Sequence, residues 1–319
     1  MRKTILAGLF AAAAIAMTSC AKESIEPKPI NDEIRLKTTV QSTQTRAIIG
    51  SHPNGKPLQP FDATFLRMDA PDNVAIPTVA DPARKVVTGT IWGNGSVVWK
   101  GTQYYPKNGY RVAMAAFAPA ADNLSGDVAT FTIDGDKDII ATGEKVGSLM
   151  NQFEEYAFNF THKLTMLQFS VQRNSDFDDD TYIKSITIRD QRTLARLEIS
   201  TGKLTFESAP VGNISVHGIE EVLIQTTPTD TKGYAMIEAG TFPKSMLNYH
   251  FLVDVVTSKG SYTQVPIVLT AGLDQFTRTQ AGVKYQITLT FANTGISVRE
   301  NSVVVTPWDG NGEGNGMVY

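Results

Sequence analysis

Hydrophobic and polar residues alternate along most of the chain with a period of two, the pattern of β-strands with one buried face. In the clearest run, Val283, Tyr285, Ile287, Leu289 and Phe291 alternate with polar residues. Gly, Asn, Asp and Pro separate short runs rich in Val, Ile, Thr and aromatic residues. The pattern predicts strands at residues 34–40, 64–68, 86–91, 96–99, 112–117, 128–133, 182–189, 221–226, 234–238, 249–256, 262–269, 284–291 and 302–306.

No stretch carries a sustained 3.6-residue apolar period with caps at both ends, so the sequence predicts an all-β fold of two tandem antiparallel β-sandwich domains. Residues 158–171 change the parity of their apolar positions midway, which requires a β-bulge or a change of sheet. We therefore place a domain boundary near residue 155. The expected parts are a signal peptide (1–20), a tether with an N-terminal strand (21–46), an N-terminal sandwich (47–155), a C-terminal sandwich (156–300) and a C-terminal strand with a flexible tail (301–319).

The first twenty residues have the layout of an export signal. Arg2 and Lys3 form a positive end, and the apolar run of residues 5–17 is too short to span a bilayer. Ser19 and Cys20 follow, and Cys20 is the only cysteine. This order predicts a lipoprotein signal that is cut between Ser19 and Cys20, with lipid attached to the thiol. The alternative is a plain secretory signal with a stray cysteine at its end.

Charge and cysteine content narrow the classes of partner. Removal of residues 1–20 takes away two of the 29 basic residues and none of the 32 acidic ones, which leaves a net charge of −5. A mildly acidic exported chain has no electrostatic case for binding nucleic acid. No later run approaches 18 consecutive apolar residues, so lipid on Cys20 would be the membrane attachment. Because a second cysteine is lacking, stability must come from burial rather than from a disulfide.

Catalytic and metal-binding patterns find little support. No phosphate-binding loop, dinucleotide fingerprint or Gly-x-Ser-x-Gly motif occurs. His162 falls on the apolar parity of its strand, which predicts a packed, hydrogen-bonded core histidine. The four histidines lie far apart, without Cys, Asp or Glu at metal-ligand spacing: His52, His162, His217 and His250. We therefore expect no enzyme, no cofactor and no metal centre.

Two acidic runs are candidate calcium sites. Residues 134–138 begin like a calcium loop, but Ile139 stands where a glycine is needed and Lys145 where a bidentate glutamate is needed. Residues 176–180 crowd four aspartates into a loop between strands, where weak calcium binding is the alternative to solvated surface carboxylates.

Aromatic residues gather between residues 92 and 105, around the hairpin turn signal Asn94-Gly95. They could form a sugar-stacking platform, although aromatics that alternate along short strands are more often core. A surface lipoprotein that binds glycans and never polymerises is therefore an alternative function. The residues concerned are Trp92, Trp99, Tyr104 and Tyr105.

Several segments together make the chain resemble the fimbrillin (type V pilin) family of Gram-negative anaerobes. They are the lipoprotein signal, the early strand that leads to Gln44-Thr45-Arg46-Ala47, residues 99–119, residues 158–164 and the closing block 281–308. The resemblance spans nearly the whole chain. It implies two transthyretin-like sandwiches and a structural subunit of a pilus, in the role of stalk, tip or anchor, that serves adhesion.

The resemblance also implies a route of assembly. An outer-membrane lipoprotein, anchored through Cys20, would be cut by an arginine-specific protease between Arg46 and Ala47. Loss of the N-terminal strand, with Ile34, Leu36 and Val40 on its apolar side, would open a groove. A strand from another pilin subunit would fill that groove by β-augmentation. The processed chain would lie in the fimbrium and meet a host or bacterial surface ligand.

The donor strand is expected near the C-terminus. Residues 302–306 are β-prone, and a glycine-rich tail follows them. We expect residues from about Gly295 onward, with Val303, Val304 and Val305 at the centre, to pass to the neighbouring subunit.

Overall fold

The computed structural model describes residues 31–40, 59–71, 76–230, 233–240, 250–271, 274–275, 278–298 and 304–307. Residues 32–319 form one compact unit, and the fold described here lies within it. Every element of regular secondary structure in these described ranges is a β-strand, which confirms the all-β prediction. No helix in the described part of the chain has the length and apolar character needed to cross a membrane.

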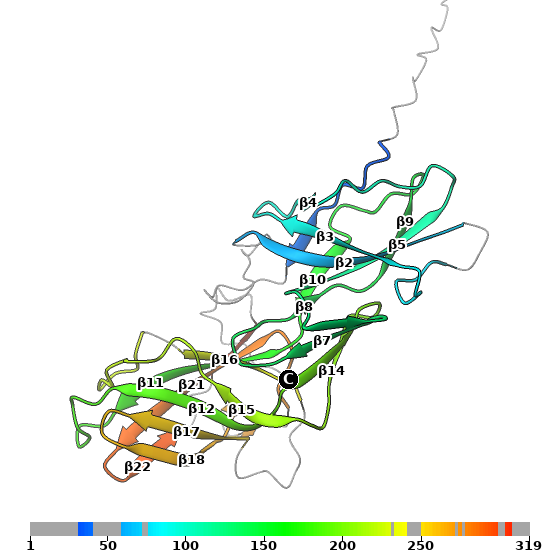
Figure 1. Cartoon of the computed structure of the whole chain (residues 1–319). Coiled ribbons are helices and arrows are strands. Elements are labelled where there is room, and N and C mark those ends of the chain that lie inside the picture. The colour runs from blue at the N-terminus through cyan, green and yellow to red at the C-terminus, as the bar shows by residue number, and fades with distance from the viewer. Residues whose placement is uncertain are drawn as a thin grey trace, which may run out of the picture. The chain divides into compact units, whose positions relative to one another are not determined.

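The largest sheet has eight strands, in the order β1-β10-β8-β5-β2-β3-β4, with β9 also paired to β5. Their bounds are β1 (Thr38–Val40), β2 (Phe61–Ala70), β3 (Lys85–Ile91), β4 (Val97–Trp99), β5 (Arg111–Ala118), β8 (Ile140–Ala141), β9 (Lys145–Ser148) and β10 (Phe158–His162). Figure 1 labels most of these strands.

Four further sheets complete the described fold. A five-stranded sheet has the order β16-β11-β21-β22, with β23 paired to β21, and its strands are β11 (Thr165–Arg173), β16 (Gly233–Ile237), β21 (Val283–Ala292), β22 (Gly295–Val298) and β23 (Val304–Pro307). A four-stranded sheet contains β15 (Val211–Ser215), β12 (Ile183–Arg192), β17 (Phe251–Thr257) and β18 (Ser261–Ile267), in that order. Another has β14 (Lys203–Phe206), β13 (Leu194–Glu198), β7 (Val128–Thr132) and β6 (Asn123–Ser125). The fifth pairs β19 (Thr270–Ala271) with β20 (Asp274–Gln275).

Strand β5 is buried on both faces, since every residue from Val112 to Ala118 is at most 1% exposed. Alternate residues of a strand point to opposite faces of the sheet. One row, which contains Met114, packs into a core around the N-terminal strand, and the other, which contains Phe117, packs into a larger core. We call the first of these the N-terminal core. It consists of Ile34, Leu36, Val40, Ala63, Phe65, Ile91, Val97, Tyr105, Val112, Met114, Ala116, Ala118, Ile140, Phe158 and Phe160.

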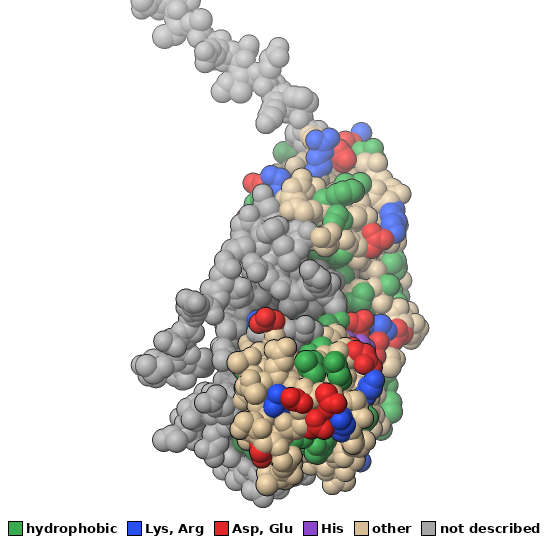
Figure 2. Space-filling view, turned by 90° about the vertical axis from the view of Figure 1, so that its left-hand side faces the viewer, with side chains coloured by type: hydrophobic (Ala, Val, Ile, Leu, Met, Phe, Trp, Pro, Cys, Tyr) green, Lys and Arg blue, Asp and Glu red, His purple; other side chains and the backbone are tan. Residues whose placement is uncertain are grey.

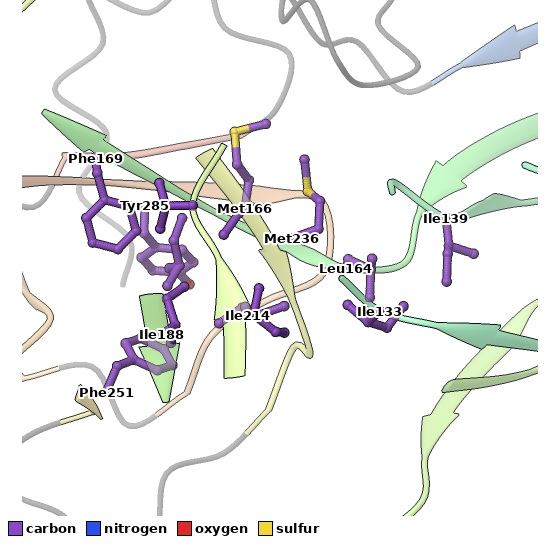
Figure 3. Close-up of a cluster of buried hydrophobic side chains, with 14 of the residues drawn as sticks. Ile133, Ile139, Leu164, Met166, Phe169, Ile188, Ile214, Met236, Phe251 and Tyr285 are labelled. Atoms are coloured by element: carbon purple, nitrogen blue, oxygen red, sulfur yellow. The ribbon is translucent and has the colours of Figure 1, made fainter. Parts of the chain in front are cut away.

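Part of the larger core lies between the five-stranded sheet and the sheet of β12 and β17. Phe169 and Tyr285 come from the first sheet, and Ile188 and Phe251 come from the second (Figure 3). Two sheets that bury facing apolar rows in this way form a β-sandwich.

The face change predicted in residues 158–171 is a change of sheet. Strand β10 belongs to the eight-stranded sheet, and β11 belongs to the five-stranded sheet. The two strands are separated by Lys163 and Leu164, and Leu164 packs in the larger core beside Ile133 and Ile139 (Figure 3). The sequence also allowed a β-bulge at this point, but in the structure the chain passes from one sheet to the other.

One sheet contains strands from before and after residue 155, because β7 (Val128–Thr132) pairs antiparallel with β13 (Leu194–Glu198). The domain boundaries given above, with the change at residue 155, stay predictions.

Two details differ from the sequence expectations. Two strand pairs, β1–β10 and β11–β21, run parallel within sheets that are otherwise antiparallel. The strand predicted at residues 221–226 is wrong, since this segment makes only the isolated bridge of Tyr182 with Leu223. Glu221 has a φ of 59°, in the left-handed region, which interrupts an extended backbone.

Candidate functional site

The N-terminal strand, defined as residues 32–40 and ending in β1, has one buried and one polar side (Figure 1, dark blue). Ile34, Leu36, Thr38 and Val40 are between 0% and 4% exposed. The residues between them are exposed or half-buried. The alternation predicted from the sequence is therefore confirmed, and Ile34, Leu36 and Val40 all lie in the N-terminal core.

The strand has neighbours on both of its edges. On one edge β1 pairs parallel with β10, with Thr38 opposite Phe158. On the other edge it forms isolated antiparallel bridges, Lys37 with Ser96 and Glu33 with Tyr104. Residues 96 and 104 flank β4, which is the far end of the eight-stranded path. The N-terminal strand therefore joins the two ends of this sheet, so its removal would leave both ends without a neighbour.

Backbone hydrogen bonds fix the strand against residues 95–105. Two are donated by the strand and two are accepted by it: Ile34 N to Gln103 O (2.7 Å), Thr38 N to Gly95 O (2.8 Å), Val97 N to Leu36 O (3.1 Å) and Tyr105 N to Asp32 O (2.6 Å). Main-chain bonds of this kind do not depend on side-chain identity, so another extended segment could in principle replace them.

Trp99 links the strand to the core. Its indole N–H donates to the carbonyl oxygen of Ile34 over 2.7 Å. Its ring packs edge-on against Phe65, with 4.8 Å between ring centroids. Because the indole ring has both an apolar body and one donor, Trp99 lines the groove and also binds the backbone of its occupant.

The groove beneath the strand is apolar. The ring centroids of Phe65 and Phe158 lie 6.2 Å apart there, and Val97 and Ile91 belong to the same core. Full burial of a Val, Leu or Ile side chain contributes about 1.5–3 kcal/mol. The three apolar side chains of the strand are thus a large part of what holds it, and an empty groove would expose the same surface to water.

The outward side of the strand makes exposed polar contacts. Asp32 pairs with Lys107 at 2.9 Å, and the Lys37 ammonium pairs with Glu155. The hydrogen bond from Lys107 lowers the pKa of Asp32, and the hydrogen bond to Glu155 raises the pKa of Lys37. These pairs are screened by solvent, so they add less to strand binding than the buried row does.

The turn between β3 and β4 touches the strand backbone. Gly95 has a φ of +83°, as the Asn94-Gly95 turn signal predicts, and a Cβ there would lie 2.5 Å from the carbonyl oxygen of Thr38. The sequence indicated the hairpin, but it gave no sign that the turn abuts the N-terminal strand.

The predicted donor residues lie partly in a strand of their own sheet. Val304 and Val305 belong to β23, which pairs antiparallel with β21. Val303 lies outside the described residues. Strand β22 pairs with the other half of β21. A donor role would require β23 to leave β21, and this role stays a prediction.

The predicted processing sites also lie outside the described residues. Ser19 and Cys20 precede them, and Arg46 and Ala47 fall between residues 40 and 59. Lipid attachment, signal cleavage and propeptide cleavage stay predictions.

The four candidate aromatics do not form one exposed platform. Trp99 is bound to Ile34, and Tyr105 is 3% exposed, with its hydroxyl accepting the backbone N–H of Phe153 over 2.8 Å. Trp92 and Tyr104 are about half exposed, at 49% and 52%. The glycan-binding alternative therefore keeps two of its four residues.

The histidines within the described ranges have structural partners. His162 is 2% exposed, and its Nδ1 lies 2.7 Å from Oδ2 of Asp138, as expected for a hydrogen-bonded core histidine. Burial raises the pKa of the Asp138 carboxyl. His250 accepts the backbone N–H of Leu269 over 2.9 Å, and His217 lies 3.3 Å from the carbonyl oxygen of Asp134.

The acidic loop at residues 178–180 brings three exposed carboxylates together. Lys259 lies beside them, with its Nζ 3.2 Å from Asp178 and 2.7 Å from Asp180. Figure 2 shows acidic and basic side chains side by side on the face that it presents. A lysine ammonium that neutralises the loop weakens the case for calcium there.

Comparison with known proteins finds a matching family and solved structures with a similar fold. A family model described as fimbrillin-like matches residues 72–308. The solved structure of a candidate cell adhesion protein from Bacteroides uniformis has a TM-score of 0.58 at 18% identity and covers 87% of this chain and 100% of that one. A second such protein, from Bacteroides ovatus, has a TM-score of 0.57 at 12% identity, with 87% and 98% covered. These structures share the fold. The comparison with curated proteins gives no match.

Proposed function

The chain belongs to the fimbrillin-like family of structural, non-enzymatic proteins of the cell surface, and we propose that it is a pilus subunit that assembles by strand exchange. The observation that carries this proposal is the N-terminal strand. It buries three apolar side chains in the N-terminal core, with Thr38 buried in the same row, and it pairs with chain segments on both of its edges.

The physics of the groove supports exchange. Removal of the strand would expose an apolar floor and leave two sheet edges with unpaired N–H and C=O groups. Another extended segment with alternating apolar residues would satisfy both the backbone groups and the floor. Such an addition joins subunits without a covalent bond.

Processing at the N-terminus would control this exchange. We propose that Cys20 carries lipid that delivers the precursor to the outer membrane. An arginine-specific protease then cuts between Arg46 and Ala47, on the C-terminal side of the N-terminal strand. The cut separates both the strand and the lipid from the polymerising body. The donor strand comes from residues after Gly295 of a neighbouring pilin subunit.

Treatment of the purified precursor with an arginine-specific protease tests the proposal. We expect one clean cut at Arg46, followed by ladders on SDS gels of unboiled samples. The matched control is Arg46→Ala, which should stay monomeric under the same treatment. A chain that is cut at Arg46, loses residues 21–46 and remains monomeric would contradict strand exchange.

Sequencing of the N-terminus of sheared surface material assigns the subunit's place in the pilus. A stalk or tip subunit should begin at Ala47, whereas an anchor should retain a lipidated Cys20. This measurement does not depend on polymerisation in vitro.

Glycan binding remains the second candidate because Trp92 and Tyr104 expose about half of their surface. A chain that stays monomeric after the cut but shifts on a polysaccharide-affinity gel, with the shift lost in Trp92→Ala, would favour it.

A further inference from the structure

The carbonyl oxygen of Gly95 accepts both a backbone and a side-chain hydrogen bond from the N-terminal strand. Thr38 is fully buried, between Leu36 and Val40 in the inward row. Its backbone N–H donates to the carbonyl oxygen of Gly95 over 2.8 Å, and its hydroxyl donates to the same oxygen over 3.1 Å. One residue of the strand thus satisfies both lone pairs of a buried carbonyl.

The turn that presents this carbonyl is held by its own hydrogen bonds. Gly95 N–H donates to the carbonyl oxygen of Trp92 over 2.7 Å. The Asn94 side-chain oxygen accepts the N–H and the hydroxyl of Ser96, at 2.9 Å and 2.6 Å. None of these bonds involves the N-terminal strand, so the Gly95 carbonyl is positioned by the turn itself and still points into the groove when the strand departs.

This carbonyl fixes the register of any occupant. A shift by one residue would turn polar outward residues such as Lys37 into the apolar groove. A shift by two residues would place an apolar side chain such as that of Leu36 against the carbonyl and leave it short of one buried hydrogen bond. The best occupant therefore has Ser or Thr, with an apolar residue two positions away on each side.

Residues 295–319 contain three Ser or Thr residues, which are Ser297, Ser302 and Thr306. Thr306 alone among them has apolar residues two positions away on both sides, Val304 and Trp308. Resting on the proposed strand exchange, we infer that Thr306 of a second copy takes the place of Thr38 and donates its hydroxyl to the Gly95 carbonyl. The incoming strand is taken to run in the direction of the N-terminal strand, which keeps its pairing with residues 96 and 104 antiparallel.

Disulfide formation between cysteines introduced in the two chains measures this register directly. Lys37 lies opposite Ser96, so residue 305 of the incoming strand should lie there when Thr306 occupies the position of Thr38. Full-length chains with Cys20→Ser and Ser96→Cys are mixed with chains that carry Cys20→Ser and one of Val303→Cys, Val305→Cys, Pro307→Cys or Asp309→Cys. The mixture is treated with the arginine-specific protease and then oxidised.

We expect a disulfide between chains for Val305→Cys, since directly opposed antiparallel residues are close enough for one. A predominant link through Val303→Cys, Pro307→Cys or Asp309→Cys overturns the register while strand exchange survives. No link between chains at any of the four positions overturns strand exchange by this C-terminal segment, and the register with it.

The hydroxyl itself is tested in the variant that links. Thr306→Val should lower the yield of the disulfide about fivefold, the effect of one hydrogen bond, and Thr306→Ser should retain the yield. Thr263→Val, at an exposed position of β18, is the matched control and should change nothing. An unchanged yield with Thr306→Val overturns the role of the hydroxyl.

Discussion

Trp99 shows how one side chain can hold the N-terminal strand without belonging to it. Its N–H donates to the Ile34 carbonyl, and its ring stays packed on Phe65. Trp99→Phe keeps most of the ring contact and removes the donor, which leaves a backbone acceptor without that bond. We expect a loss of about 1 kcal/mol in the free energy of unfolding, measured by urea denaturation.

Trp92→Phe is the matched control for this change. Trp92 is 49% exposed, so its replacement should leave the unfolding midpoint unchanged. Equal effects of the two substitutions would contradict a specific role for the Trp99 donor.

The first residue of the strand makes its attachment sensitive to acid. Lys107 lowers the pKa of Asp32 below the ordinary value of 3.8. A lowered pKa in the folded state stabilises the fold above the unfolded pKa, and this stabilisation is lost as the pH falls through the folded value. Below about pH 4 we expect faster hydrogen exchange at the Tyr105 N–H, which donates to the Asp32 carbonyl.

Asp32→Asn separates this effect from general acid unfolding. The variant should exchange the Tyr105 N–H at a rate that varies little with pH through the same window, once intrinsic exchange is corrected for. Because the pair with Lys107 is exposed, added salt should reduce the difference between the two proteins. A salt-independent difference would point to another group.

At the scale of elements, the turn before β4 and the N-terminal strand fit closely. Gly95 and Gly109 have nearly the same φ, +83° and +80°. A Cβ at Gly95 would meet Thr38, whereas a Cβ at Gly109 has nothing within 4 Å. Gly109→Ala should therefore cost only the backbone strain, about 1–2 kcal/mol. Gly95→Ala should cost more and should also loosen the strand.

Limited proteolysis within residues 41–58 measures that loosening. Gly95→Ala should be cut faster than Gly109→Ala under native conditions, even at matched global stability. Equal rates for the two variants would mean that the turn does not help to retain the strand.

The sequence could predict this strand but not the segments that contact it. Alternation in residues 34–40 indicates which side chains point inward, Thr38 included, because a strand has a strict period of two. Alternation contains no information on partners, so neither the parallel pairing with β10 nor the contact with Gly95 could be predicted. For the same reason the sequence suggested a sugar-stacking role for Trp99 and did not show that it donates a hydrogen bond to Ile34.

Alternation in the sequence also fails to predict short strands with few apolar residues. Strand β13 buries only Ala195 and Leu197 fully, and β14 has four residues, none of them fully buried. Such segments carry too few apolar residues to show a period. The opposite error occurred at residues 221–226, where β-prone residues follow the left-handed backbone of Glu221. The change of buried face between β10 and β11 was predictable because both strands have strongly apolar rows, but the sequence left open whether a β-bulge or a change of sheet produces it.

At the scale of the whole molecule, the groove and the proposed donor belong to opposite ends of one chain. Deletion of residues 301–319 removes β23, which pairs with β21 in the described structure. The shortened chain should fold and keep its groove, but it should have no strand to donate. Mixed with the intact chain after protease treatment, it should cap filaments and shorten them in proportion to its fraction, as seen by electron microscopy.

Two other outcomes of this experiment would have different meanings. Filaments of normal length from the deletion variant alone would show that the donor lies elsewhere. Loss of folding in this variant, read by circular dichroism, calls for Thr306→Val as the milder substitute, and that variant should shorten filaments without unfolding.

The N-terminal strand is joined to the rest of the fold through residues 41–60. This covalent connection keeps the strand near its groove at an effective concentration on the order of millimolar. After the proposed cut, the same peptide competes from dilute solution, on the order of a micromolar or less. The thousandfold difference equals about 4 kcal/mol, although no contact in the groove has changed. A single broken peptide bond would therefore turn a self-bound chain into one whose groove favours whichever strand is locally most concentrated, and at a growing tip that is the strand of the next subunit.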